Sequence, residues 1–383
     1  MYTFSRVCIF IFVLSLFGCG SIYEVRTDTN NAAFKTLDEA SFLKTECKPG
    51  TAAVGEENRS IEEYGDVTIG YVEVDDQGWF YDSDAKQMKA ILKRMRSELG
   101  NEALSDAQFT TLVFVHGWHH NAHDNDCNVN EFRLMAQHTV DALKTNDRTR
   151  KHRLFGIYVG WRGESIDIPG LRYSTIIGRR VTADHVAKGS VRQLFAELAK
   201  LQYEERSRNK SDPKGRMRTI VVGHSFGGLI AFNATSQALL NDLVMGEPSL
   251  RDPAHPELGC IPQDELDQHW TWPDQVDLIN PAFEASRFEP FYSVSQEASG
   301  CKYGRRPPKL LIVTADNDSA TGVLFQILRW GSTAFERYNT SDQERHDAER
   351  FRWALVSAGP LERYRGAVQG IYRQTSKCRT LCQ

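Results

Sequence analysis

The sequence lacks a long basic block, and the apolar run near its N-terminus is short. Its 46 Lys and Arg residues are balanced by 50 Asp and Glu residues, for a formal net charge of -4. A nucleic-acid partner would call for Lys and Arg clustered on one face, so this balance speaks against one. The apolar run, residues 7–17, has eleven residues, well short of the roughly 20 that a membrane-spanning helix needs.

The N-terminal run has the features of an export signal instead. One early cation, Arg6, precedes an apolar stretch of the length found in secretory signals. The stretch closes on Leu-Phe-Gly-Cys at 16–19, which resembles the lipobox of bacterial lipoproteins. The resemblance implies that residues 1–18 are removed and that Cys19 is lipidated. Because Gly20 is not acidic, it also implies sorting to the periplasmic face of the outer membrane. The alternatives are an uncleaved anchor and a plain signal peptide with an incidental cysteine.

Cysteine usage agrees with export. Of the eight cysteines, six remain when Cys8 and Cys19 are set aside, and an even number in an oxidising compartment allows up to three disulfides. Fifteen pairings are open. No pair has a zinc-site spacing with histidines. The six are Cys47, Cys127, Cys260, Cys301, Cys378 and Cys382.

Strand-like and helix-like segments alternate along most of the chain. Short apolar, β-branched runs predict buried strands, and amphipathic segments predict helices between them. Strands are predicted at 66–74, 110–117, 153–161, 218–223, 275–280 and 309–314. Helices are predicted at 83–99, 130–144, 191–208, 226–243 and 322–335. The alternation predicts an α/β fold with a mainly parallel sheet flanked by helices on both faces.

The same pattern predicts the domain organisation. Residues 19–60 are polar and are interpreted as a tether with one short helix near 38–44, and residues 61–383 are interpreted as a single domain. Two stretches, 162–183 and 244–273, do not fit the alternation. Ligands bind such sheets at the carboxyl ends of the strands, where inserts of this kind gather. We therefore expect these two inserts to form walls or a lid over the ligand-binding site.

The stretch TIVVGHSFGGLIAF, residues 219–232, joins a predicted strand directly to a predicted helix. It contains Gly-x-Ser-x-Gly, in which Gly223 and Gly227 flank Ser225 and His224 precedes the serine. A nucleophile elbow requires this strand–turn–helix context, with glycines that leave room for a tight backbone turn. The helix beyond Ser225 directs its amide dipoles at developing negative charge. The alternative is a glycine-rich turn with an incidental serine.

A second motif, VFVHGW, ends a predicted strand about one hundred residues upstream. Together with GHSFGG, LINPAF and LLIVTADND, it makes residues 66–335 resemble the α/β-hydrolases of the serine esterase and lipase type. The resemblance implies an oxyanion hole formed by the backbone N–H groups of Trp118 and Phe226. It also implies that His116 is a structural loop residue and that no cofactor is needed.

The loop after VFVHGW has many groups that could bind a metal. Imidazoles and carboxylates suit several divalent ions. A loop beside an active site is polar in any case, and serine chemistry needs no metal, so we predict none. The groups are His116, His119, His120, His123, Asp124 and Asp126.

The resemblance also predicts where the catalytic acid and base lie. The acid should follow a late strand, which offers Asp318 by its distance from the strand end and Asp316 as the alternative. The family order of serine, acid and histidine then leaves only His346 as the base. Its segment, SDQERHDAERFRW, is charged and differs from the Gly-His loop usual in the family.

These observations predict an exported, membrane-anchored serine hydrolase that cleaves carboxylic esters through Ser225. A lipase or phospholipase acting on envelope lipids is the alternative within enzymes. A catalytically inactive hydrolase fold, kept as a binding protein of the envelope, is the alternative from another class, and the altered C-terminal segment motivates it.

Overall fold

The structure is a computed structural model. It describes residues 24–35, 57–82, 84–163, 176–208, 215–245, 272–283, 285–291, 294 and 309–313. Within these ranges the chain forms one eight-stranded sheet, in the order β1-β2-β3-β5-β4-β6-β7-β8. The strands are β1 Asp28–Phe34, β2 Arg59–Tyr64, β3 Val67–Val74, β4 Gln108–Val115, β5 His152–Trp161, β6 Met217–His224, β7 Gln275–Ile279 and β8 Leu310–Val313.

The sheet is mainly parallel. From β3 to β8 every neighbouring pair is parallel, so these six strands all end at the same edge, which we call the carboxyl edge. The opposite edge is the amino edge. Strand β2 pairs antiparallel with β3, and β1 pairs parallel with β2, so both of these strands run the other way.

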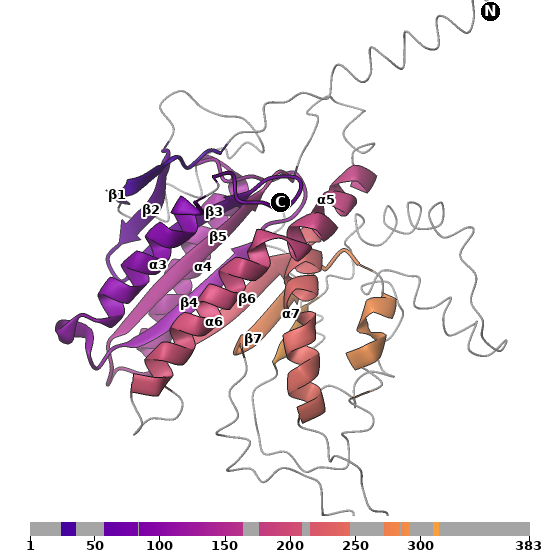
Figure 1. The fold of residues 1–383 in the computed structure, drawn as a ribbon. Helices are drawn as coiled ribbons and strands as arrows, with labels where there is room; N and C mark the ends of the chain where they lie inside the picture. Colours follow the sequence, from indigo (N-terminus) through magenta and orange to yellow (C-terminus); the bar gives the residue numbers. More distant parts are fainter. Residues whose placement is uncertain are drawn as a thin grey trace, which may run out of the picture.

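Helices cover both faces of the sheet, as predicted (Figure 1). One face carries α3, α5, α6 and α7, and the other carries α4, whose buried side chains form a separate cluster. The helices are α3 Lys86–Leu99, α4 Cys127–Asn146, α5 Ile176–Lys188, α6 Ser190–Arg208 and α7 Phe226–Met245. Two short 3-10 helices are η1 Glu102–Leu104 and η3 Ala285–Phe288.

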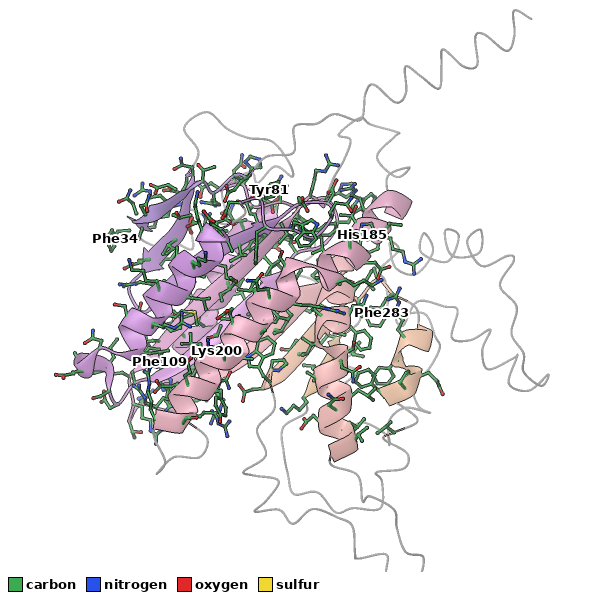
Figure 2. The ribbon with its side chains drawn as sticks, viewed as in Figure 1. Phe34, Tyr81, Phe109, His185, Lys200 and Phe283 are labelled. Carbon is green, nitrogen blue, oxygen red and sulfur yellow. The ribbon has the colours of Figure 1, made fainter. Side chains whose placement is uncertain are left out.

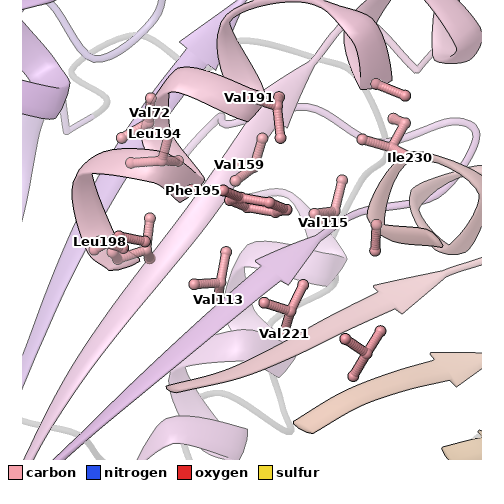
Figure 3. Packing of buried hydrophobic residues seen from close by; sticks show 14 of the residues in the cluster. Val72, Val113, Val115, Val159, Val191, Leu194, Phe195, Leu198, Val221 and Ile230 are labelled. Atoms are coloured by element: carbon pink, nitrogen blue, oxygen red, sulfur yellow. The ribbon is translucent and has the colours of Figure 1, made fainter. Parts of the chain in front are cut away.

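Alternation along the central strands explains why both faces need a cover. In β4, Val113 and Val115 belong to the cluster under α6 and α7, whereas Leu112 and Phe114 belong to the cluster under α4. Successive side chains of a strand point to opposite faces, so an unbroken apolar run is buried on both. Figure 3 shows Val113 and Val115 beside Phe195 of α6.

The sheet starts earlier in the chain than predicted, which corrects the interpretation of 19–60 as a tether. Strand β1 lies wholly inside that stretch, and β2 begins at Arg59. Neither strand shows an alternating apolar pattern: β1 reads DTNNAAF and β2 reads RSIEEY. The predicted short helix near 38–44 lies outside the described residues.

The insert predicted at 162–183 is also corrected in part. Residues 176–183 belong to α5, which packs against α7 on the face of the sheet and does not form a separate cover. Most of the insert at 244–273 and the helix predicted at 322–335 lie outside the described residues. In the described part of the chain, no helix is both long and apolar enough to cross a membrane.

A buried ionic cluster connects the N-terminal part of the chain, which includes β1 and β2, to the rest of the fold. Glu62 of β2 is fully buried and accepts hydrogen bonds from Arg26, at 3.2 Å, and from Arg133 of α4, at 2.6 Å. Lys35 reaches the same carboxylate at 3.1 Å and Asp124 at 2.9 Å. The hydroxyl groups of Tyr64 and Tyr71 also donate to Glu62. We call these residues, with Asp124, the Glu62 cluster.

Candidate functional site

Ser225 stands at the sharp turn between β6, which ends at His224, and α7, which begins at Phe226. Its φ is 54°, in the left-handed region. For a residue other than glycine this conformation costs roughly 1–2 kcal/mol. The turn carries the half-buried Ser225 side chain to the carboxyl edge of the sheet. Strain of this kind is the backbone signature of a nucleophile elbow.

Hydrogen bonds from the neighbouring strand hold Ser225 in this conformation. Its N–H donates to the carbonyl of Ile279, the last residue of β7, at 2.9 Å. Its carbonyl accepts from the N–H of Ala282 at 3.0 Å. The segment LINPAF, residues 278–283, therefore supports the turn through its backbone. Asn280 makes this possible by taking a left-handed φ of 43° itself, which Asn tolerates better than most residues.

The two glycines of the motif are required by close backbone contacts. A Cβ atom on Gly223 would lie 2.5 Å from the carbonyl oxygen of Gly227. A Cβ atom on Gly227 would overlap the carbonyl oxygen of Val115, at the end of β4. The elbow thus fits only because neither residue has a side chain. This geometry agrees with the role that the sequence predicted for both glycines.

The loop after β4 lies directly against the serine. A Cβ atom on Gly117 would be 3.1 Å from Cβ of Ser225, so the backbone of the next residue, Trp118, also lies close to the elbow. Phe226 and Gly227 are the first residues of α7, and amide groups at that position have no carbonyl partner within a helix. Of the predicted oxyanion-hole residues, Phe226 thus adjoins Ser225 in the chain, and Trp118 follows Gly117, which lies against Ser225.

His116 holds this loop and has no ring nitrogen left for Ser225. The N–H of Trp161 donates to Nε2 of His116 at 3.0 Å, so the proton of the neutral ring is on Nδ1, which donates to the carbonyl of Gly117 at 2.8 Å. The ring also stacks on Trp161. The resemblance implied a structural His116, and this environment gives the physical reason. Burial lowers the pKa of His116 from 6.5 to about 4.

Acidification should destabilise the protein through His116. His116 takes up a proton near pH 6.5 in the unfolded chain and near pH 4 in the folded chain. Its contribution to the free energy of unfolding is therefore fully present above pH 6.5 and falls as the pH drops from 6.5 to 4. The full loss is on the order of 3 kcal/mol. Denaturant unfolding at pH 7.5 and 4.5 should show a smaller pH dependence for His116→Gln than for the wild type. His138→Gln, which changes an exposed histidine, is the control; an equal effect of both variants would contradict the assignment.

Another histidine of the same loop faces a carboxylate. Nδ1 of His120 lies 3.0 Å from Oδ1 of Asp126, which is fully buried. Asp126 also caps α4 by accepting the N–H of Asn128. The loop is tied to the end of β5 as well, because the N–H of Gly163 donates to the carbonyl of His120. An imidazole oriented by a buried carboxylate is an arrangement found in general bases, although holding the loop is a sufficient role for this pair.

The loop after β4 has several residue types that can bind a metal. Across the described residues, no group of three or more His, Cys, Asp or Glu side chains is placed to hold a metal ion. Asp124, one of the possible ligands, instead belongs to the Glu62 cluster and accepts from Lys35 and Arg133.

Several predicted functional residues lie outside the described residues: Cys19, Asp316, Asp318 and His346. The description of β8 ends at Val313, three residues before Asp316, at the same edge to which β6 brings Ser225. Cys127, at the start of α4, is in a disulfide whose other cysteine also lies outside the described residues.

No family model, no curated protein and no solved structure matches this chain. The chemistry of the site therefore has to be argued from its own residues. These are a strained serine between a strand and a helix, a loop in contact with it, and a helix N-terminus behind it.

Proposed function

We propose that the protein is a serine hydrolase of the α/β-hydrolase type that cleaves carboxylic esters. The observation that carries this proposal is the conformation of Ser225. A left-handed serine is held by backbone bonds on both sides, at the carboxyl edge of a mainly parallel sheet. A turn that served only to reverse the chain would be easier to build with glycine at this position. Placing a serine there favours a nucleophile.

In the proposed reaction, Oγ of Ser225 attacks the ester carbonyl while a histidine takes its proton. The negative charge that develops on the carbonyl oxygen is stabilised by the N–H groups of Phe226 and Trp118. The tetrahedral intermediate collapses to an acyl-enzyme, and the histidine returns the proton to the leaving alcohol. Water then hydrolyses the acyl-enzyme by the same route. These steps require no cofactor.

The base and its carboxylate are assigned from the sequence. His346 is the only histidine after the predicted acid, and Asp318 is preferred over Asp316 as that acid. The alternative base is His120, because Asp126 already orients its imidazole.

We further propose that the protein is exported and anchored by a lipid on Cys19 to the periplasmic face of the outer membrane. The lipobox-like residues 16–19 are the basis of this proposal. The disulfide of Cys127 supports the exported location, because disulfides persist in oxidising compartments. The substrate would then be an ester or lipid of the envelope.

A fluorophosphonate probe tests the proposal directly. An activated serine displaces fluoride from the phosphorus and stays covalently modified, whereas an ordinary serine does not react. The native full-length protein is expected to take up one probe, at Ser225, and heat-denatured protein to take up none. Intact-mass and peptide mass spectrometry report both results.

Two variants sharpen this experiment. Ser225→Ala should abolish labelling. Ser236→Ala, which removes a partly exposed serine further along α7, should label like the wild type. Native protein that remains unlabelled, or a Ser225→Ala variant that is still labelled, would refute an activated Ser225.

A further inference from the structure

The N-terminal segment is fixed to the carboxyl edge of the sheet. The N–H groups of Val25 and Arg26 donate to the carboxylate of Glu73, near the end of β3, at 3.1 and 2.8 Å. Gln87 of α3 donates to the carbonyl of Arg26 at 2.9 Å. The chain therefore enters the fold beside the end of β3, at the same edge as Ser225.

The chain between this point and the predicted lipid is short. Cys19 precedes Glu24 by five residues, and an extended chain spans at most about 3.6 Å per residue, so the lipidated residue lies within roughly 18 Å of Glu24. Strand β3 has 8 residues and is about 26 Å long. A tether of this length cannot pass along β3 to the amino edge. A bilayer that holds the lipid therefore lies nearer the carboxyl edge than the amino edge.

An exposed tryptophan lies at the carboxyl edge of the sheet, next to the end of β3. Trp79, in the loop 75–80 that follows β3, is 66% exposed. A side chain of this size is rarely so exposed, and indole groups favour the boundary between water and lipid. Val181, on the exposed side of α5, is 51% exposed. Gly78 links the two elements, because a Cβ atom there would lie 2.6 Å from the carbonyl oxygen of His185, one turn after Val181.

The loop holds Trp79 outward by hydrogen bonds. The N–H of Trp79 donates to the side chain of Asp75 at 2.8 Å, and its carbonyl accepts from the N–H of Asp75 at 2.8 Å. The N–H of Ser190, at the start of α6, donates to the carbonyl of Gly78 at 2.6 Å. The turn is thus fixed on both sides, so the indole of Trp79 is exposed although its backbone is firmly held.

We propose that loop 75–80, together with the exposed side of α5 around Val181, is the surface that contacts the bilayer in which the protein's own lipid is inserted. The indole of Trp79 lies at the level of the lipid headgroups. The proposal rests on lipidation of Cys19 and is independent of hydrolysis. Asp75 and Asp76 lie in the same loop, and Asp76 pairs with Arg162 and Arg179, so the proposed contact does not depend on attraction to anionic headgroups.

This orientation turns the elbow toward the membrane. In the sheet, β3 and β6 are separated by β5 and β4, so their ends are about 14 Å apart. Figure 2 shows Tyr81, just after the loop, and His185 of α5 at the end of the molecule away from Phe109. Ser225 would then meet esters presented at the lipid surface.

Lipid contacts can be measured on the mature full-length protein. The protein is purified from membranes, its lipid on Cys19 is verified by mass spectrometry, and it is placed in phosphatidylcholine vesicles with bromine atoms near the headgroup end of the acyl chains. Bromine quenches nearby indoles. Because the chain has seven tryptophans, the signal of Trp79 is the difference between the wild type and Trp79→Phe. We expect the wild type to be quenched and most of that quenching to be lost in Trp79→Phe.

Exposed aromatic residues at the amino edge provide the control. Phe34 is 80% exposed, and the N–H of its neighbour Lys35 donates to the carbonyl of Glu63, near the end of β2. Tyr203, near the end of α6, is 58% exposed. Phe34→Ala should leave the quenching unchanged. With a photoactivatable phospholipid in the vesicles, crosslinks on the wild-type protein should map to loop 75–80 and to α5. This measurement uses the wild-type protein alone, so it does not depend on whether a variant folds.

Three results would overturn the proposal. One is verified lipidated protein in which Trp79→Phe does not change the quenching. Another is a set of crosslinks centred on Phe34 or Tyr203. The third is a mature chain without lipid on Cys19, which removes the premise but leaves the labelling of Ser225 as a separate question.

Discussion

Replacing Ser225 with alanine is expected to abolish ester hydrolysis while leaving the fold intact. Loss of the nucleophile in a serine hydrolase lowers kcat by on the order of 10⁶, because the triad acts as a unit. The backbone bonds to Ile279 and Ala282 do not involve the side chain, and alanine adopts the left-handed φ at a cost similar to that of serine. Hydrolysis of a short nitrophenyl ester and a denaturant unfolding curve measure the two effects.

The same assay tests which histidine serves as base in the proposed reaction. We expect His346→Ala to lose as much activity as Ser225→Ala, and the double variant to lose little more. His120→Gln should retain the wild-type pH–rate profile, with any loss confined to stability, because His120 is expected only to hold its loop. The opposite result, an active His346→Ala and an inactive His120→Gln, would move the role of base to His120 and that of acid to Asp126.

Removing the carboxylate of Glu62 is expected to cause a large loss of stability. Burial alone would raise the pKa of Glu62, but Arg133 and Arg26 lower it below its usual range, so the group is charged in the folded protein. Glu62→Ala would leave Arg26 and Arg133, both almost fully buried, facing a cavity. Removing one partner of a buried ion pair typically costs about 3–5 kcal/mol. Denaturant unfolding of the oxidised full-length protein at pH 7 measures this loss.

The next residue of the same strand provides a matched control. Glu63 pairs with Arg94 at 3.2 Å, and both side chains are partly exposed. Exposed ion pairs contribute about 0–1 kcal/mol, so Glu63→Ala should have a small effect. If Glu62→Ala were no more destabilising than Glu63→Ala, the Glu62 cluster would not contribute to stability as its burial implies.

Apolar patterning explains which strands were predicted from the sequence. All six predicted strands are present as β3 to β8, and their bounds agree with the structure within two residues at each end. Their runs are apolar because both faces are covered. Strands β1 and β2 gave no such signal. They lie at the margin of the sheet. Strand β2 fully buries Glu62 in ionic contacts, whereas a sequence pattern assigns a glutamate to solvent.

The candidate site was predictable where it is encoded in consecutive residues. The elbow around Ser225 is such a motif, and the structure gives it the expected turn. The support of the elbow was not predictable, since it comes from backbone groups of Ile279 and Ala282 after another strand. The bonds that fix His116 likewise involve Trp161, 45 residues away. A backbone group can make such a hydrogen bond whatever its side chain, so these partners cannot be recognised from residue types in the sequence.

The contacts of Arg26 also bear on the order in which the chain folds. Its guanidinium bonds Glu62, 36 residues away, and the carbonyl of Ala122, 96 residues away. Contacts between distant parts of a chain form late, because a long loop has to close first. In the export proposed above, the segment that leaves the export machinery first would thus be among the last to be fixed. The charge of Arg26 stays in water until the loop before α4 is in place, so the lipidation proposed for Cys19 could take place while the sheet assembles.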